Sequence, residues 1–283
     1  MINSFRRIRK SLFKKNKFNS YLLYAIGEII LVVIGILIAL WINNRNNLKQ
    51  RDNLEIELLQ QVNEELHRMK VDIRNDLFFL EKGNEAHFRI KDALISKDTY
   101  NDTLTFDFYW LAKDEYIYPV NTAFNRLKEE GLSIIQNDTI RTNLTSCYES
   151  YFPRLSKKNP FHPDLELFFS SYYQEYFTVN NDMSLESTVK SPDLSINYPY
   201  PYPDKINGKD YEITVGFIPN DFESLKKDSK FKVLLRQAYT YRRYKIRWYK
   251  STQILLNEVL KNIDKELSKR APESNYKIKL ELE

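Results

Sequence analysis

YLLYAIGEIILVVIGILIALWI, residues 21–42, is an apolar stretch that contains a single charged residue, Glu28. Fourteen of its residues are Leu, Ile or Val. At about 1.5 Å per residue, a helix of this length spans roughly 33 Å, which is enough to cross a hydrocarbon core about 30 Å thick. The aliphatic residues contribute roughly −0.3 to −0.6 kcal/mol each to insertion and outweigh a penalty of about 2.5 to 3.5 kcal/mol for a central charge. We therefore predict a transmembrane helix over residues 21–42.

The charges beside this stretch predict its orientation. Residues 1–20 carry seven cations and no acid, whereas the other flank carries three cations before the first acid, Asp52. Lys and Arg are retained on the cytoplasmic side, so we expect the N-terminus in the cytoplasm. A cleaved signal peptide has a shorter apolar run, of about 7–15 residues, and a small-x-small cleavage site. This run is longer and ends in Ala39-Leu40-Trp41, so an uncleaved signal anchor is favoured.

The excess positive charge is confined to the membrane flank. The chain has 43 basic and 38 acidic residues, of which residues 1–51 hold ten basic and one acidic. The remainder is therefore slightly acidic, with 33 basic and 37 acidic residues, and does not indicate nucleic-acid binding. The basic flank could instead lie on anionic membrane lipid, with residues 2–15 as a short interfacial helix, or it could be a disordered segment that only sets the topology.

Two long helices are expected in the remainder of the chain. Apolar residues recur every three or four positions over residues 59–80 and 231–267, which places each set on one face of a helix. We expect the membrane helix to continue outward to about residue 80, with an interruption at Gly83-Asn84 and a last stretch to Ile95.

Shorter helices are expected between the two long ones. They are predicted to begin near Thr122, Asp138 and Asp164, where a residue that can cap a helix is followed by apolar residues at helical spacing. Residues 96–120 are mixed and alternate briefly at 103–109, the Tyr-Pro run at 198–203 favours polyproline II, and 211–217 resembles a strand. The prediction is an all-α fold: a single N-terminal transmembrane helix that continues into an extracytoplasmic helical bundle with long first and last helices. The domain would cover residues 43–270, followed by a tail at 271–283.

The predicted membrane anchor also resembles a known sequence family. Residues 17–40, KFNSYLLYAIGEIILVVIGILIAL, followed by INN at 42–44, resemble the signature of an uncharacterised Gram-negative bacterial membrane family that is known only as a domain of unknown function. Residues 122–144, with LKEEGL and IIQND, are similar to the second block of that family. Trp41 and Arg45 stand where the family pattern has Gln and Trp. The resemblance covers most of the chain and implies a membrane anchor joined to a helical domain, but no activity.

Motifs for enzymatic chemistry are absent from the sequence. The six glycines form no GxG pair and no GxxxxGK, so no phosphate-cradling loop is expected. The three His are scattered, and neither HExxH nor CxxC occurs, so no zinc site is expected. Cys147 beside Tyr148 is interpreted as a buried small hydrophobe rather than as a nucleophile paired with a distant His. We therefore expect no catalytic residue, no metal and no cofactor.

Two groups of residues remain as candidates for function. The first lies in the membrane helix: Gly27, Glu28, Gly35 and Ala39 share a face on which small residues allow close helix–helix approach. The alternative is that Glu28 reaches the inner interface or Lys17 and has no partner.

The second group lies in FKVLLRQAYTYRRYKIRWYK, residues 231–250, where cations and aromatics interleave. Such side chains could bind an anionic lipid or glycan, and the candidates are Arg242, Arg243, Tyr244, Arg247 and Trp248. The alternative is that these cations pair with acids of the first long helix: Glu55, Glu57, Glu64, Glu65, Asp72 and Asp76.

We expect a single-pass protein of the bacterial inner (cytoplasmic) membrane with a periplasmic domain. The preferred function is a non-catalytic interaction or sensor-like module that works through protein partners or through self-association of the transmembrane helix. A binding module for an anionic envelope ligand is the alternative, and an envelope enzyme is a weaker one. A filled helical core favours the first, a deep pocket lined by the basic and aromatic residues the second, and a cleft with perturbed acids the third.

Overall fold

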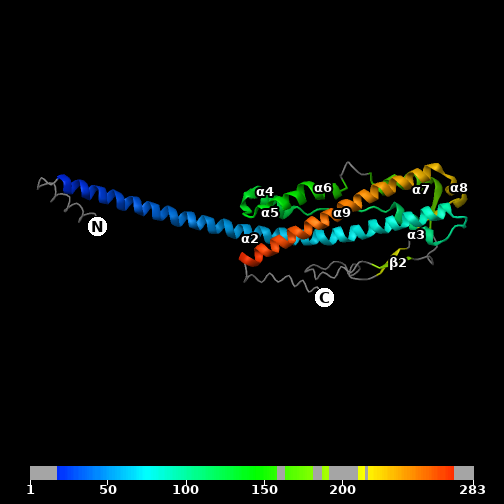
Figure 1. Cartoon of the computed structure of the whole chain (residues 1–283), viewed down its shortest axis with the longest axis horizontal. Coiled ribbons are helices and arrows are strands. Elements are labelled where there is room, and N and C mark those ends of the chain that lie inside the picture. Colours follow the sequence, from blue (N-terminus) through cyan, green and yellow to red (C-terminus); the bar gives the residue numbers. More distant parts are fainter. Residues whose placement is uncertain (1–17, 158–162, 181–186, 191–209, 214–215, 271–283) are drawn as a thin grey trace. The chain divides into compact units, whose positions relative to one another are not determined.

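The computed structural model describes residues 18–157, 163–180, 187–190, 210–213 and 216–270 (Figure 1). The predicted basic segment, except for its last three residues, the Tyr-Pro run and the C-terminal tail lie outside the described residues. The helices are α2 (Phe18–Ile95), α3 (Thr103–Ala112), α4 (Thr122–Glu130), η1 (Leu132–Ile134), α5 (Asp138–Ser146), η2 (Cys147–Tyr151), α6 (Phe152–Leu155), α7 (Leu165–Tyr176), α8 (Phe222–Lys227) and α9 (Ser229–Arg270). The strands are β1 (Phe177–Val179), β2 (Ser187–Lys190), β3 (Asp210–Ile213) and β4 (Phe217–Pro219). The chain forms two compact units, which divide between Glu55 and Ile56.

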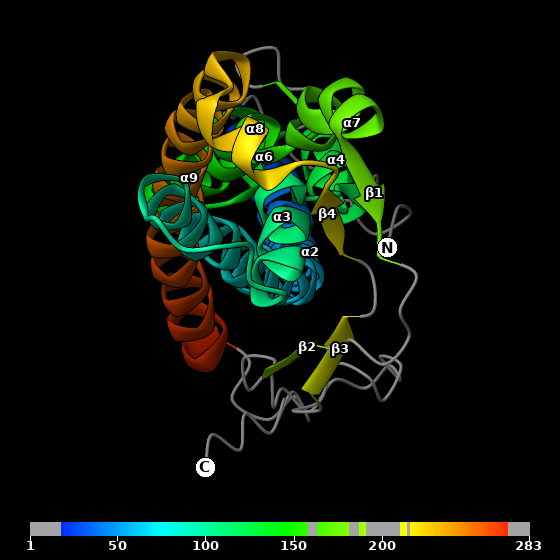
Figure 2. The ribbon, with the colours of Figure 1, turned by 90° about the vertical axis from the view of Figure 1, so that its right-hand side faces the viewer.

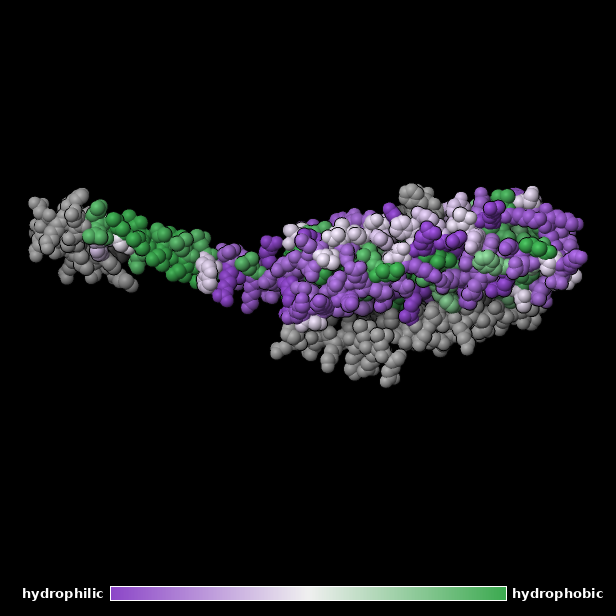
Figure 3. Space-filling model, viewed as in Figure 1, coloured by the Kyte–Doolittle hydropathy of each residue, from purple (hydrophilic) through white to green (hydrophobic). Residues whose placement is uncertain are grey.

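The first unit contains the apolar part of α2. Its Leu, Ile and Val side chains over residues 22–42 are exposed, and they form the hydrophobic band seen in Figure 3. Within the described residues, α2 is the helix that is long and apolar enough to cross a membrane. Exposed aliphatic side chains on every face of a helix are typical of a segment whose solvent is lipid.

The second unit is built on an antiparallel pair of helices, α9 and the part of α2 after Ile56 (Figure 1). Side-chain contacts run in opposite order along the two helices: Asn63 with Asp264, Asp76 with Tyr249, and Gly83 with Arg242. The predicted helical architecture is confirmed, because the described chain is mostly helical, with a long apolar first helix and a long last helix. The two short antiparallel strand pairs, β1–β4 and β2–β3, are additions to that prediction.

The predicted interruption at Gly83-Asn84 is wrong, because α2 continues through both residues to Ile95. Gly83 instead allows neighbouring helices to pack closely against α2. A Cβ atom at this position would lie 2.7 Å from the Nε of Arg242 and 2.7 Å from the carbonyl oxygen of Trp110. The missing side chain lets α9 and α3 approach α2, at the conformational penalty of a glycine inside a helix.

The mixed segment 96–120 contains a helix that the sequence did not predict. In α3, seven of the ten residues are buried, including the run from Leu104 to Phe108. A helix that is buried on most sides has no clear polar face, so its pattern resembles the brief alternation of a strand. The strand-like piece 211–217 corresponds to β3 and β4, which are separated by residues outside the described part of the chain.

Aromatic side chains fill the end of the domain where α3, α7 and α8 surround α2 and α9. Phe108, Phe169, Tyr172 and Phe231 are each at most 1% exposed. The β1–β4 pair lies against α3 and α7 (Figure 2). Burying an aromatic side chain contributes about 1.5–3 kcal/mol, so this cluster supplies a large share of the apolar stabilisation.

The other end of the domain is closed by α5, η2 and α6, which pack beside α9, and by α4, which is bonded to α2. Glu65 of α2 is buried there, and it accepts a hydrogen bond of 2.9 Å from the backbone N–H of Ala123 in the first turn of α4. A carboxylate at a helix N-terminus satisfies a free N–H group and complements the helix dipole. Burial raises the pKa of Glu65 despite these contacts.

Candidate functional site

One face of α9 is buried along most of its length and includes two cations. The buried positions are spaced by three and four residues: Leu235, Ala238, Arg242, Lys245, Tyr249, Thr252 and Leu256. This spacing keeps them on one side of the helix, facing the core. Arg242 and Lys245 therefore belong to the interior of the domain.

Arg242 is fully buried and donates hydrogen bonds to backbone carbonyl groups. Its Nη2 lies 2.6 Å from the oxygen of Leu111 and 3.2 Å from that of Lys113, and its Nη1 lies 3.3 Å from that of Gly83. Burial lowers its pKa to about 10, which still leaves the guanidinium charged at neutral pH. The prediction that Arg242 joins a surface anion site does not fit this placement, because its donors are directed at the C-terminal end of α3 and at Gly83 of α2.

Lys245 forms a buried ion pair with Asp114. The Nζ and Oδ1 atoms are 2.7 Å apart, and the two side chains are 4% and 2% exposed. The other oxygen of Asp114 accepts hydrogen bonds from the hydroxyl of Tyr116 (2.8 Å) and from the N–H of Leu165 (3.1 Å). The ammonium also lies 3.4 Å from the centre of the Tyr116 ring. This pair connects α9 to the segment after α3 and to the start of α7.

Asp76 of α2 lies next to this pair and accepts a hydrogen bond of 2.9 Å from the hydroxyl of Tyr249. Burial and, second, the negative charge of Glu115 raise the pKa of Asp76 to about 7. Burial likewise lowers the pKa of Lys245. We call this group the buried polar network, and its members are Asp76, Asp114, Tyr116, Arg242, Lys245 and Tyr249.

The predicted pairing of α9 cations with acids of the first long helix takes a different form. The acid that pairs with Lys245 is Asp114, which lies after α3, and Asp76 is bound by a tyrosine. Lys250 does pair with an acid of α2, Glu81, at 2.7 Å on the surface. The basic stretch of α9 is therefore divided between the core and the surface of the domain.

The remaining predicted anion-binding residues lie on the surface. Arg243, Tyr244 and Arg247 are exposed, whereas Trp248 is half-buried. The guanidinium of Arg154 lies 4.3 Å from the centre of the Trp248 ring, and Tyr151 packs edge-on against that ring at 5.6 Å. We call the following six residues the α9 arginine surface: Arg243, Tyr244, Arg247, Trp248, Arg154 and Tyr151. Within the described part of the chain, no ion pair involves Arg243 or Arg247.

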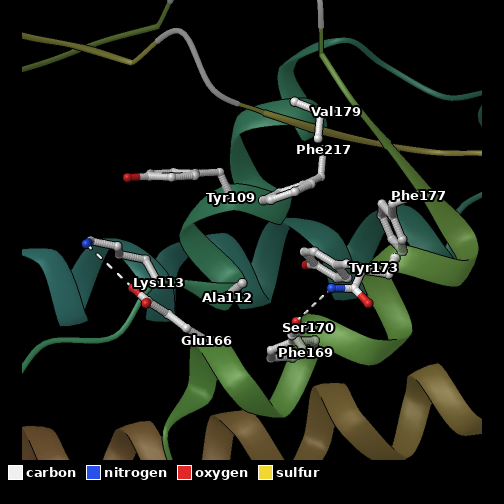
Figure 4. Close-up of a pocket in the computed structure, with 11 residues that line it drawn as sticks. Tyr109, Ala112, Lys113, Glu166, Phe169, Ser170, Tyr173, Phe177, Val179 and Phe217 are labelled. Atoms are coloured by element: carbon white, nitrogen blue, oxygen red, sulfur yellow. Dashed lines mark hydrogen bonds and ion pairs between the residues drawn. The ribbon is translucent and has the colours of Figure 1, made fainter. Parts of the chain in front are cut away.

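A pocket of about 370 Å³ opens between α3, α7, β1 and β4 (Figure 4). Aromatic side chains form most of its wall: Tyr109, Phe169, Tyr173, Phe177 and Phe217. Lys113 and Glu166 lie at one end of the pocket, 3.6 Å apart, and Phe177 lies at the other end (Figure 4). No member of the buried polar network lines it.

The polar groups around this pocket, apart from the hydroxyl of Tyr109, are bonded to one another or to the backbone. Lys113 also contacts Glu115 at 3.4 Å, Gln174 donates to Ser170 at 3.4 Å, and the hydroxyl of Tyr173 donates to the carbonyl of Phe108 at 2.8 Å. A site for a polar ligand needs a few convergent groups that are free to bind it. This pocket therefore suits a small apolar or aromatic group.

The candidate helix-association residues belong to the first compact unit. Gly27, Glu28, Gly35 and Ala39 are exposed. A Cβ atom added at Gly27 or Gly35 would meet no atom within 4 Å. Helix association through these four residues stays a prediction.

Cys147 is buried, as its interpretation as a packing residue requires. Burial raises the pKa of its thiol to about 12, so the nucleophilic thiolate is strongly disfavoured at neutral pH. No group of three or more His, Cys, Asp or Glu that could hold a metal ion occurs among the described residues.

Comparison with known protein families matches residues 28–192, more than half of the chain, to a family of unknown function, DUF6090. The chain belongs to DUF6090. The resemblance to an uncharacterised family is thereby confirmed. The match to DUF6090 begins inside the apolar segment and extends through β2. No curated protein and no solved structure matches the chain.

Proposed function

We propose that this chain is a single-pass protein of the bacterial inner membrane, with a cytoplasmic N-terminus and a periplasmic domain over residues 43–270. Two observations support this proposal. The apolar side chains over residues 22–42 are exposed, and the flank at 1–20 carries seven cations against three on the other side.

We further propose that the domain is a non-catalytic interaction or sensor-like module. The observation that carries this proposal is the α9 arginine surface. Arg, Tyr and Trp are enriched among the residues that dominate the binding energy of protein interfaces, and the rings of Tyr and Trp offer large contact areas with few rotamers to fix. Here the Trp248 ring already packs against Arg154 and Tyr151, so part of the ordering entropy is lost before a partner binds.

The charge of this surface specifies the chemistry of its partner. Arg243 and Arg247 are separated by one helical turn and expose two guanidinium groups on the same face of α9. Carboxylate side chains pair with guanidinium groups in bidentate geometry. The partner is therefore expected to present an acidic segment with at least one apolar side chain.

Photocrosslinking in native membranes tests the interaction module. The full chain would carry p-benzoylphenylalanine in place of Tyr244, which is 43% exposed. We expect a crosslinked product with another envelope protein, identified by mass spectrometry. The double variant Arg243→Glu/Arg247→Glu should reduce that product at least roughly tenfold, because two attractive charges become repulsive.

Lys261→Glu is the matched control, because it reverses one exposed cation of the same helix at a distance from this surface. It should leave the product unchanged. Recovery of the chain alone, or crosslinked only to itself from Tyr244, would contradict the proposed interaction module.

Self-association through the membrane helix is the second part of the proposal. Gly27, Gly35 and Ala39 allow close approach of two helices, and Glu28 can hydrogen-bond across the contact. Gly35→Leu should reduce disulfide crosslinking between chains in which Cys147 is replaced by Ala and a single cysteine is introduced at Leu31. Crosslinking at the wild-type level in that variant would show that this face is not the contact.

A further inference from the structure

A second pocket, of about 450 Å³, lies between the last turns of α2 and the first turns of α9. Its apolar wall includes Phe88, Ile95 and Tyr239, and its rim includes Lys91, Lys232 and Arg236. Ligand pockets usually have volumes of about 300–1,000 Å³, so this one has the size for a small molecule.

The wall of this pocket is held in place by stacked rings. His87 is 6% exposed, and its ring stacks on that of Tyr239 with a centroid distance of 4.6 Å. Phe88 packs edge-on against Tyr239 at 5.5 Å and is 42% exposed, and Ile95 is 74% exposed. Exposed apolar side chains beside a rigid aromatic wall gain free energy when an apolar group covers them.

The charge of the pocket comes from its three cations. Burial, followed by the charges of Arg242 and Lys91, lowers the pKa of His87 to about 4, so the imidazole is neutral at pH 7. No acidic residue lines the pocket, which leaves three positive charges. Within the described residues, none of the three cations takes part in an ion pair.

Several other cations of this domain do have an acidic partner. Lys82 lies 3.0 Å from Glu85, Lys226 lies 2.8 Å from Glu223, and several further lysines and arginines have similar partners. Three like charges that face a low-dielectric wall repel one another, and an anion between them removes that repulsion. The three cations favour a ligand with a negative charge, and the apolar wall favours a ligand with an apolar body.

We propose that this pocket binds a small amphipathic organic anion, that is, an aromatic or aliphatic body that carries a carboxylate or a similar acidic group. The apolar body would lie against Phe88, Ile95 and Tyr239, and the acidic group would contact Lys91, Lys232 and Arg236. An inorganic anion would leave the apolar wall exposed, and a neutral ligand would leave the three charges unpaired. This inference is independent of the α9 arginine surface, which lies further along the same helix.

Photolabelling of the full chain in phosphatidylcholine nanodiscs tests this proposal. The probe is 4-benzoylbenzoate, and neutral benzophenone is the comparator with the same ring system. After irradiation, peptide mapping should locate the carboxylate label in segments 87–95 and 232–239. Octanoate should compete with the label, whereas inorganic phosphate at the same concentration should not.

Two matched double variants decide the origin of the labelling. Lys232→Gln/Arg236→Gln should lower the affinity for the probe by roughly tenfold or more, because two charge-assisted contacts are lost. Arg243→Gln/Arg247→Gln removes two exposed cations of the same helix outside the pocket and should leave the affinity unchanged. All four side chains are exposed, so circular dichroism should show the same helicity in every variant.

Three results would overturn the proposal. Equal labelling of both segments by neutral benzophenone would show that the charge has no role. Competition by phosphate as effective as that by octanoate would show that the apolar wall has no role. Equal affinity of the wild type and the Lys232→Gln/Arg236→Gln variant would show that the probe binds elsewhere.

Discussion

Asp114→Asn is expected to destabilise the domain more than any substitution of a surface ion pair. The change keeps the shape of the side chain and removes its charge. Lys245 would then hold an ammonium group that is 4% exposed and has lost the carboxylate at 2.7 Å. The hydroxyl of Tyr116 and the N–H of Leu165 donate to the same side chain, so the new amide group would also face donors.

The magnitude follows from the burial of the pair. Removing one partner of a buried ion pair costs about 3–5 kcal/mol, because the other charge stays desolvated. For a domain of this size, each kcal/mol lowers Tm by about 2–4 °C, so a loss of roughly 10 °C is expected. Glu81→Gln breaks the Lys250–Glu81 pair, whose side chains are 55% and 45% exposed, and should cost less than about 1 kcal/mol.

Urea unfolding of the full chain in mild detergent, followed by circular dichroism, measures both variants under the same conditions. The second substitution Lys245→Met, made in the Asp114→Asn background, should recover part of the lost stability, because it removes the unpaired charge. Equal losses for Asp114→Asn and Glu81→Gln, or no recovery in the double variant, would refute the assignment of Lys245 and Asp114 as a buried pair.

Three further predictions concern single residues. Gly83→Val should lower the free energy of unfolding by about 1–3 kcal/mol or more, since its Cβ would meet the Trp110 carbonyl, whereas Gly35→Ala should leave thermal unfolding unchanged. Burial raises the pKa of Asp76 from 3.8 to about 7, so the folded state binds more protons than the unfolded state between these values. The contribution of Asp76 to stability therefore falls as pH rises from about 4 to 7, and Asp76→Asn should gain stability relative to the wild type across that range in urea titrations. Cys147, whose thiol pKa burial raises to about 12, should react with a maleimide only when the domain unfolds, and fast labelling of the folded chain would contradict its placement.

The long helices could be predicted from the sequence because their apolar spacing is regular over many turns. Gly83 was misinterpreted because glycine has two roles in a helix. It can end the helix, or it can admit a neighbouring group, and only the position of Arg242 decides between them. The burial of α3 on most sides removed the amphipathic pattern that would have identified it.

The buried polar network could likewise be predicted from the sequence only in part. The burial of Arg242 and Lys245 could have been inferred, because both continue the three-and-four spacing of Leu235, Ala238 and Tyr249. The many cations of residues 231–250 suggested a basic surface instead. Asp114 lies in an irregular segment with no periodicity, so its pairing with Lys245 depends on a contact between residues 131 positions apart. The sequence offers no local signal for that contact.

The pocket between α2 and α9 was missed for the same reason. Lys232 and Arg236 belong to the basic stretch 231–250, but Lys91 and Phe88 come from the last turns of α2, far away in the sequence. A pattern on one helix can reveal which residues share a face. It does not reveal which residues of a second helix complete the site.

The most direct test of the account is protease protection in sealed spheroplasts of cells that express the full chain with an epitope tag before Met1. We predict that protease added outside removes the domain and leaves a short fragment with the N-terminal tag. If the chain stays intact while a reporter fused after Glu283 is active in the cytosol, the proposed orientation is contradicted.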